Sequence, residues 1–299
     1  MFGFAPCLPR LRLPTLAMIL ILGGLVLAAP AARAQEQVLH YFPAGPIYDF
    51  RWKVLELALS HAQPGTPPHL APLEEEVSQN RALRLLDAGG LDVIALGSNP
   101  EREALLLPVR IDILRGLVGL RLLLIRAADQ DRIAAMDDAT VRRQLTFGLN
   151  SQWADLPIMQ AAGYKVATST RHETLFEMLS SGRFDAFPRG TNEARQEIAQ
   201  RQSIYPQLAL EKTKALYFPY PIYFWVNKTN RALAETIERG LRLALQDGSF
   251  DQLFLSFHAA DIAALSAEHR HVIRMDNPFL PPGTPAPDTR SWWPKSAVP

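Results

Sequence analysis

Two short stretches of the chain carry the polar side chains best suited to holding a small solute. These stretches are residues 150–153 and 188–193, and the side chains that we single out in them are Asn150, Ser151, Trp153, Arg189 and Glu193. An arginine guanidinium presents a planar fork of donors that fits a carboxylate. The free N–H groups at the start of a helix also favour an anion. The sequence therefore predicts binding of a small polar or anionic solute at these two places.

The elements around these stretches alternate between short apolar strands and helices of about a dozen residues. We expect strands at 145–150, 165–168 and 183–187, and helices at 152–162 and 171–181. Ser151 is the predicted N-cap of the first helix, and Thr170 with Glu173 has the capping-box spacing for the second. Gly163 and Gly182 stand where helices end. Such a pattern is typical of a parallel sheet, which binds ligands at the carboxyl ends of its strands.

The preceding part of the chain repeats this pattern. We expect strands at 38–42, 69–73 and 91–96, with one helix capped by Asp49 and another capped by Ser78. Two long extended segments, 108–126 and 208–227, are predicted to cross between the two units. Pro219 and Pro221 restrict the second of them to edge or crossover geometry. Helices capped by Asn230 and Ser249 then return to the first unit.

This order predicts an α/β protein with two lobes, each a mostly parallel sheet flanked by helices, joined by two extended crossovers. We expect residues 35–115 and 216–275 to form lobe 1 and residues 116–215 to form lobe 2, followed by a Pro-rich tail, 276–299. Tyr41 ends the first strand and is expected to face the cleft between the lobes. A ligand that contacts both lobes only in the closed state would favour closure.

The N-terminal segment is predicted to be a signal peptide. Arg10 and Arg12 precede an apolar run, and an A-x-A cleavage pattern ends at Ala34, so residues 1–34 would be removed on export to the periplasm. Cleavage would remove Cys7, the single cysteine, and three of the 31 lysines and arginines, which leaves 28 against 30 acids. This balance argues against nucleic-acid binding by bulk charge. We expect a monomer without metal or cofactor.

Several passages resemble the periplasmic solute-binding proteins, in the type II branch that serves polar amino acid importers (family 3). Residues 85–95 resemble the helix-to-strand passage of that family, and Ser98 to Arg102 resembles its Thr-x-x-Glu-Arg turn. Residues 179–186 resemble its L-x-x-G-x-x-D-A passage, and residues 227–233 and 240–250 resemble its closing helices. The resemblance covers about residues 38–258, and the order and spacing of the passages make it specific.

The resemblance implies roles for particular residues. In that family the arginine of the turn grips the ligand carboxylate, and a backbone amide at a helix start in the second lobe assists. The arginine corresponds to Arg102, with Ser98 in the same turn, and the amide corresponds to the Ser151 region. The family also places an acid after the D-A strand to hold an ammonium group. Here that place holds Arg189, which could grip a second anionic group, and Glu193 could supply the acid instead.

Simpler interpretations remain open for the same residues. Arg102 could be a surface arginine paired with Glu101 or Glu103, and Arg189 could pair with Glu193 alone. Trp153 could be partly buried filler rather than a stacking platform. The aromatic residues of the second crossover are interpreted as hinge packing, and they are Tyr217, Phe218, Tyr220 and Tyr223.

The sequence therefore predicts an exported binding protein that closes on a small polar or anionic solute, amino acid-like or carboxylate, for an ABC-type importer with its membrane permease. The alternative is a periplasmic sensor that reports to a separate membrane receptor. An enzyme is the third hypothesis. It ranks last because the chain has no G-x-S-x-G, P-loop or G-x-G-x-x-G pattern to support it. A dehydratase or lytic activity would need an acid/base pair in the cleft.

Overall fold

The computed structural model describes residues 1–3, 5 and 37–286. The chain divides into a short unit, Met1–Gln35, and a compact unit, Glu36–Pro299, which holds all the helices and strands described below. The predicted signal peptide lies almost wholly outside the described residues, as does the pair Trp292 and Trp293. None of the described helices has the length and apolar character needed to cross a membrane.

The first lobe is built on a small sheet. Strands β1 (Val38–Tyr41) and β2 (His69–Pro72) pair in parallel, and a parallel bridge from Tyr41 to Val93 connects them to the next three strands. These strands are β3 (Ile94–Gly97), β10 (Ile222–Asn227) and β4 (Leu106–Val109). Their order is β3-β10-β4, and β10 runs antiparallel to both neighbours. β10 therefore returns the chain to the first lobe, as the second crossover predicted.

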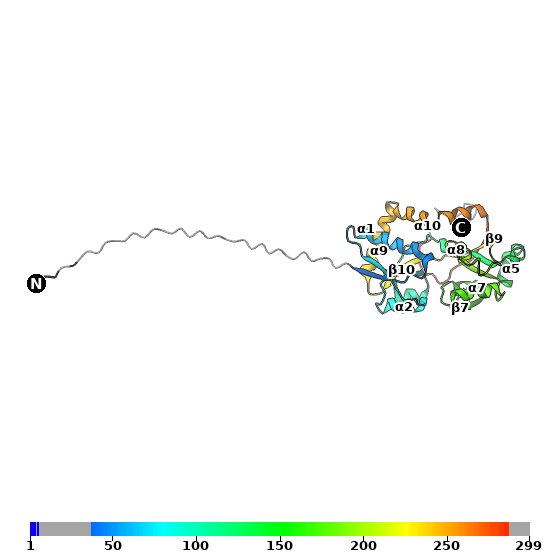
Figure 1. Cartoon of the computed structure of the whole chain (residues 1–299), viewed down its shortest axis with the longest axis horizontal. Helices are drawn as coiled ribbons and strands as arrows, with labels where there is room; N and C mark the ends of the chain where they lie inside the picture. The colour runs from blue at the N-terminus through cyan, green and yellow to red at the C-terminus, as the bar shows by residue number, and fades with distance from the viewer. Residues whose placement is uncertain (4, 6–36, 287–299) are drawn as a thin grey trace. The chain divides into compact units, whose positions relative to one another are not determined.

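Helices cover this sheet. They are α1 (Asp49–Ala62), α2 (Gln79–Asp87), α3 (Pro100–Leu105), α9 (Arg231–Gln246) and α10 (Ser249–Glu268), with the 3-10 turn η1 (Pro46–Tyr48) before α1. α1 and α9 lie side by side (Figure 1). Their closest approach is at Gly240, where any Cβ would collide with the backbone of Ala58. Ser78 and Asn230 cap α2 and α9 as predicted, because their side chains accept the N–H groups of Arg81 and Leu233.

The second lobe contains a six-stranded sheet of order β11-β9-β5-β8-β6-β7. Its strands are β5 (Leu120–Arg126), β6 (Thr146–Asn150), β7 (Lys165–Ser169), β8 (Ala186–Gly190), β9 (Leu208–Tyr217) and β11 (His271–Arg274). β6 is parallel to β7 and β8, whereas β5 is antiparallel to β8 and β9. The two crossing segments thus enter this sheet next to each other, and the expected α/β class with two lobes is confirmed.

Shorter helices flank the larger sheet. They are α4 (Gln130–Ala134), α5 (Asp138–Gln144), α6 (Asp155–Ala161), α7 (His172–Ser180) and α8 (Thr191–Arg201), with the 3-10 turns η2 (Leu117–Gly119) and η3 (Ala127–Asp129). Gly163 and Gly182 end α6 and α7 with φ of +81° and +73°, as predicted. The lobe boundaries stay a prediction. β11, which the sequence did not predict, falls in the range assigned to the first lobe and pairs with β9.

Several predicted helix starts are wrong. α6 begins at Asp155 rather than at 152, and Ser151 does not cap it, because Asn150 Oδ1 accepts the Gln152 N–H and holds the segment as a turn. α7 has no side-chain cap, so the Thr170–Glu173 capping box is absent, and Glu173 pairs with Arg201 instead. Asp49 and Ser249 do not cap α1 and α10 either.

The third predicted strand lies three residues further along the chain than expected. β8 covers Ala186–Gly190 rather than 183–187. The Asp185 carboxylate accepts the Thr146 N–H at 2.9 Å and pairs with Arg132 at 2.8 Å, which holds residue 185 in the turn before the strand. Arg189 is therefore a strand residue, fully enclosed by the sheet and its helices, and not part of a loop.

The predicted extended segments are both interrupted. Residues 108–126 contain β4, a turn and η2 before β5. Asp112 organises the turn: its carboxylate accepts N–H groups of Leu114 and Gly116 in the first crossing and of Ile222 in the second. Burial raises the pKa of Asp112 to about 6, although these three bonds act in the opposite direction. The second crossing is broken between β9 and β10 at residues 218–221.

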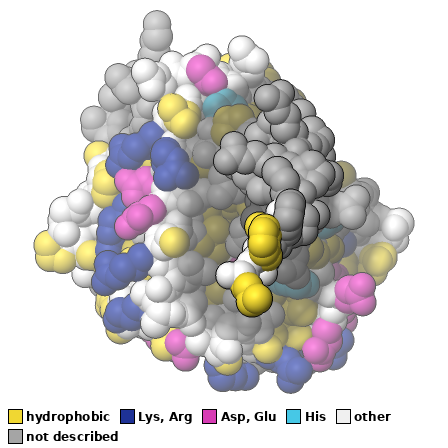
Figure 2. Space-filling model, turned by 90° about the vertical axis from the view of Figure 1, so that its left-hand side faces the viewer, with side chains coloured by type: hydrophobic (Ala, Val, Ile, Leu, Met, Phe, Trp, Pro, Cys, Tyr) yellow, Lys and Arg dark blue, Asp and Glu magenta, His cyan; other side chains and the backbone are white. Residues whose placement is uncertain are grey.

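The surface carries mixed charge. On the face shown in Figure 2, basic and acidic side chains lie interspersed, in keeping with totals of 31 and 30 in the sequence. Such a surface has no strong single-sign field to attract a polyanion.

Candidate ligand-binding cleft

A cavity of about 660 Å³ opens between the two sheets, a size within the range of small-molecule sites. The first lobe lines it with residues of η1, α1, the start of α2 and the end of β3. The second lobe lines it with residues of β5, the segment after β6, the start of α7, β8 and one face of α8. Strand ends and helix starts from both lobes meet here, which is where the strand–helix alternation predicts a site.

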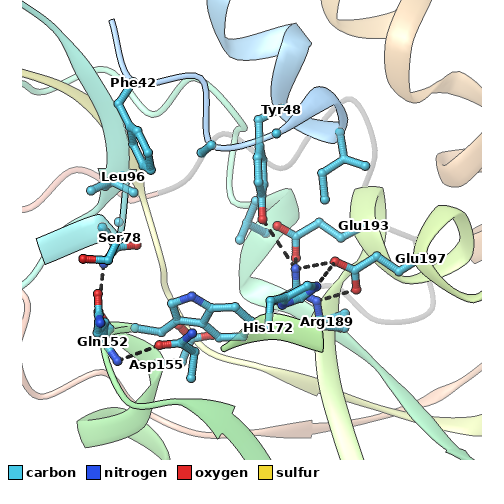
Figure 3. Close-up of a pocket in the computed structure, with 18 of the residues that line it drawn as sticks. Phe42, Tyr48, Ser78, Leu96, Gln152, Asp155, His172, Arg189, Glu193 and Glu197 are labelled. Atoms are coloured by element: carbon cyan, nitrogen blue, oxygen red, sulfur yellow. Dashed lines mark hydrogen bonds and ion pairs between the residues drawn. The ribbon is translucent and has the colours of Figure 1, made fainter. Parts of the chain in front are cut away.

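Arg189 is the centre of a buried charge cluster (Figure 3). Its Nε lies 2.6 Å from Glu197 Oε2, and its Nη2 lies 2.9 Å from Glu193 Oε2. All three residues are at most 3% exposed. Burial alone would raise the pKa of Glu197, but the charge of Arg189 and bonds from His172 and Arg189 outweigh it and lower the pKa to about 2. Arg189 is thus satisfied by two carboxylates of its own chain.

A second buried pair lies beside this cluster. Arg121 Nη2 is 2.7 Å from Asp155 Oδ2, and Arg121 Nη1 is 3.9 Å from Glu193 Oε2. Glu193 Oε2 also accepts the Gly190 N–H at 3.0 Å, which fixes the start of α8. Among its buried residues the second lobe therefore presents two arginines and three carboxylates to the cleft, an excess of one negative charge. With the more exposed Arg171, Glu173 and Arg201, the charges of its lining balance.

Arg51 supplies the opposite charge from the first lobe. It lines the cavity from the first turn of α1 and is 6% exposed. Its Nη1 donates to the Ala95 carbonyl at 2.8 Å, and its guanidinium lies 4.2 Å from the centre of the Tyr48 ring. Within residues 37–286 no carboxylate is in ion-pair contact with it, and its Nε has no hydrogen-bond partner. Burial lowers the pKa of Arg51 because it disfavours the charged guanidinium. An anion beside Arg51 would stabilise that charged form.

Arg102 is buried behind the cavity wall. It is 2% exposed, and its Nη1 donates to the Gly97 carbonyl. The Tyr220 hydroxyl interacts with the guanidinium of Arg102 and with the carboxylate of Asp155. Tyr220 and Gly97 line the cavity, whereas Arg102 does not. The interpretation of Arg102 as a surface arginine paired with Glu101 or Glu103 is therefore wrong, because Glu103 pairs with Arg110 and Arg102 faces inward.

An aromatic group forms the floor of the cleft. Trp153 stacks on Phe187 at 6.1 Å with an interplanar angle of 12°, and the Arg189 guanidinium lies 4.5 Å from the centre of the Trp153 ring. His172, at the start of α7, lies 5.8 Å from Trp153 and donates to or accepts from Glu197 at 3.1 Å. This floor can support a flat or apolar part of a ligand.

Hydrogen bonds join the lobes across the cleft, including one of 3.5 Å from Arg189 Nη2 to the Tyr48 hydroxyl. Gln79 Nε2 donates to the Gln152 carbonyl at 2.8 Å, and the Asn80 N–H donates to Gln152 Oε1 at 3.2 Å. Both donors belong to the start of α2, and Gln152 belongs to the turn before α6. The described conformation is therefore one in which the lobes touch.

The structure brings four of the predicted site residues together and places the other four elsewhere. Asn150, Trp153, Arg189 and Glu193 line the cavity. Outside its lining, Tyr41 packs on Trp52, Ser98 Oγ donates to Glu103, Arg102 is buried, and Ser151 N–H donates to the Ser169 carbonyl. Ligand roles for all eight stay predictions.

Several residues that line the cleft were not among the predicted site residues. They are Tyr48, Arg51, Arg121, Asp155, Glu197 and Tyr220. Glu197 carried a usable signal, because it follows Glu193 by four residues and must share its helix face. The interpretation of the aromatic residues of the second crossover as hinge packing stays a prediction; Tyr220 also lines the cavity, whereas Tyr217, Phe218 and Tyr223 are buried outside it.

Comparison with known proteins identifies the fold. No family model matches the sequence. No curated protein matches it either. Among solved structures, a mutant of ArgBP from T. maritima is similar with a TM-score of 0.54 and 17% identity, over 75% of this chain and 95% of that one. ArtJ, the arginine-, lysine-, histidine-binding protein of Geobacillus stearothermophilus, is similar with a TM-score of 0.54 and 11% identity, over 75% and 96%.

A domain of a third protein shares the fold as well. The VFT2 domain of BvgS from Bordetella pertussis matches with a TM-score of 0.54 and 18% identity, over 74% of this chain and 93% of that domain. The chain thus has the two-lobed fold of type II periplasmic binding proteins, as the resemblance in its sequence implies.

Proposed function

We propose that this chain is an exported binding protein whose cleft closes on a small anionic or polar solute. The observation that carries this proposal is Arg51. A buried guanidinium without a carboxylate partner is costly, and a ligand anion at the cavity wall offsets that cost. Arginine is well suited to the task because its donors match a carboxylate in pairs.

The position of Arg51 also links binding to closure. Arg51 belongs to the first lobe, whereas the acidic cluster around Arg189 belongs to the second. A solute with an anionic group on Arg51 and polar groups toward Glu193 contacts both lobes only when they are together. Such a ligand stabilises the closed state by its differential contacts.

The known proteins with this fold support a role in solute binding. The similar structures include ArtJ and an ancestral arginine-binding protein. In our proposal an ABC-type importer with its permease receives the solute. A sensing role is the second candidate, because the solved structures also include a histidine kinase sensor domain. Dependence of solute uptake on the protein supports the first role, and a ligand-dependent response of a membrane receptor supports the second.

A calorimetric comparison of Arg51→Gln with the wild type tests the proposal. A thermal-shift screen of amino acids, dicarboxylates and sugar acids first identifies a solute that stabilises the wild type. We expect Arg51→Gln to bind it roughly 10- to 100-fold more weakly, because a hydrogen bond to a charged group contributes about 1.5–3 kcal/mol. Arg242→Gln is the control, since Arg242 is an exposed arginine of α9. Full affinity in Arg51→Gln would show that the anion binds elsewhere.

We further expect binding without turnover. An ancestral amino acid-binding protein described as a precursor of cyclohexadienyl dehydratase shares the fold, so chemistry in such a cleft deserves a direct check. The identified solute should be recovered unchanged after prolonged incubation with the protein, as followed by NMR. Conversion that depends on Asp155 or Glu193 would instead assign an enzyme.

A further inference from the structure

Two buried arginines of the first lobe each donate a hydrogen bond to a backbone carbonyl of strand β3. Arg51 donates to the carbonyl of Ala95 and Arg102 to the carbonyl of Gly97. These carbonyls are two residues apart on β3 and so point the same way, roughly 7 Å from each other. The two arginines share a further property: each has an Nε that is buried without a hydrogen-bond partner, and neither forms an ion pair within the described part of the chain.

The two arginines differ in their access to the cavity. Arg51 lines the cavity, but Arg102 does not. Tyr220 lines the cavity and is in contact with Arg102, and it lies at the break between the crossing strands β9 and β10. Its ring is packed directly on Gly97, because a Cβ on Gly97 would collide with Cζ, Cε1 and the hydroxyl of Tyr220. The fit therefore depends on glycine at position 97.

The hydroxyl of Tyr220 contacts two charged groups. It interacts with the Arg102 guanidinium on one side and with the Asp155 carboxylate on the other, and Asp155 is held by Arg121 at 2.7 Å. This arrangement connects the buried cation to a carboxylate of the second lobe. An incoming anion would have to displace the phenol and also approach Asp155, which repels it.

We propose that Tyr220 determines which anion the cleft accepts, because its phenol occupies the space in front of Arg102 and leaves Arg51 as the arginine open to the ligand. This inference rests on the proposed function. It predicts that a solute with one anionic group fits the wild-type cleft. It also predicts that removing the Tyr220 ring exposes Arg102 and adds a second anion subsite roughly 7 Å from the one at Arg51.

Accessibility of Arg102 provides a test that needs no ligand. Phenylglyoxal, a small dicarbonyl that reacts with guanidinium groups, is applied to the folded protein, and modified arginines are identified by peptide mass spectrometry. We expect Arg102 to be protected in the wild type and in Tyr220→Phe, whose ring still covers Gly97. We expect it to lose this protection in Tyr220→Ala.

A second variant opens the same place by a different route. Gly97→Ala forces the end of the Tyr220 ring away and should also expose Arg102, without deleting any aromatic side chain. Circular dichroism and a thermal melt confirm that each variant is folded. Protection of Arg102 in both folded variants would overturn the proposal, whatever the result for Arg51 in the wild type.

Binding then tests the effect on specificity. Succinate and butyrate are compared by calorimetry on the wild type, on Tyr220→Ala and on Tyr220→Ala combined with Arg102→Gln. We expect Tyr220→Ala to improve succinate relative to butyrate by about tenfold, the effect of one added charge-assisted hydrogen bond. The double variant should lose that gain. An equal preference in all three proteins would overturn the role of Tyr220 in specificity, while loss of binding in Arg51→Gln would still support the proposed function.

Discussion

Six charged side chains of the cleft are buried, and their partners decide what each can do. Arg189 and Arg121 are held by carboxylates of the same lobe, so their charge is already compensated. Arg51 has a carbonyl and an aromatic ring as its direct neighbours and no carboxylate of the described residues in ion-pair contact, and the charge of Glu193 acts on it only from a distance. The distinction between a structural arginine and a ligand-binding one therefore lies in the partners of each, and both are equally buried.

Removing the positive charge of Arg189 should destabilise the fold rather than only weaken binding. Arg189→Met leaves Glu193 and Glu197 buried without their cation, and loss of one partner of a buried ion pair costs about 3–5 kcal/mol. Urea unfolding followed by circular dichroism measures this loss. Arg242→Met breaks an exposed pair with Glu238 and should stay within about 1 kcal/mol of the wild type. Equal stability of the two variants would contradict the structural role of Arg189.

His258 predicts a pH dependence of stability that is separate from the cleft. Its ring lies among Phe50, Phe254 and Phe257, its Nε2 has no partner, and burial lowers its pKa from 6.5 to about 4. The unfolded chain therefore binds a proton more readily than the folded one between pH 6.5 and 4, so acidification through that range lowers the free energy of unfolding.

The variant His258→Leu isolates this effect. Asp112, whose pKa is raised, acts in the opposite direction at acidic pH and is present in both proteins. From pH 7 to pH 4 the wild type should lose up to about 3 kcal/mol relative to His258→Leu, because each pKa unit corresponds to 1.36 kcal/mol. Urea unfolding at several pH values measures the difference. A constant difference would show that His258 titrates normally in the folded protein.

Residue types alone do not reveal which buried arginine of the cleft lacks a carboxylate in ion-pair contact among residues 37–286. The sequence indicates that Glu193 and Glu197 share a helix face, and it places Arg189 just before them. It does not indicate that β8 starts three residues late and carries Arg189 into the sheet, because the Asp185 contacts that hold the turn come from residues distant in sequence. Arg51 lies in the helix predicted after residue 49, but its contact with Ala95 depends on the placement of β3.

At the scale of elements, some predicted helix caps form and others do not. Ser78 and Asn230 cap the helices predicted for them, since a cap needs only its own next few residues. Ser151 and Thr170 fail as caps, because the turn after β6 and the pairing of Glu173 with Arg201 draw these segments into tertiary contacts. Local chemistry thus predicts elements reliably where no distant partner competes.

The contact between α1 and α9 gives a prediction that runs against helix propensity. Alanine is the better helix former by about 1 kcal/mol, yet Gly240→Ala should destabilise the protein, because the new Cβ meets the backbone of Ala58 rather than a movable side chain. A thermal melt should show a lower midpoint than the wild type. Arg239→Ala, at an exposed position of the same helix, is the control and should be neutral or stabilising. A stabilised Gly240→Ala would mean that α1 and α9 are further apart.

At the scale of the molecule, the sequence sufficed for the two-lobed α/β plan and for the two crossings, because strand–helix alternation repeats twice with an extended segment after each repeat. It did not reveal β11, whose four residues pair with β9 after the long helix α10. It also did not reveal the contacts across the cleft, which depend on how the lobes meet.

The interlobe bonds of Gln152 lead to a prediction about binding. Gln79→Ala removes the 2.8 Å bond to the Gln152 carbonyl and should weaken solute binding by several-fold, since one net hydrogen bond contributes about 1 kcal/mol to the closed state. Calorimetry measures the affinity, and small-angle scattering measures the radius of gyration without ligand. Glu75→Ala, a nearby exposed change, is the control. Unchanged affinity and radius would show that this bond does not bias closure.

The carboxylate of Asp112 has a mechanical consequence for the lobes. It binds backbone N–H groups from both crossings, at Leu114 and Gly116 on one and at Ile222 on the other. The crossings are therefore fastened to one another beside the cleft, and neither can slide past its neighbour without breaking these bonds. We therefore expect any opening of the lobes to be a rotation about a shared pivot, with the mouth widening most at the rim farthest from Asp112.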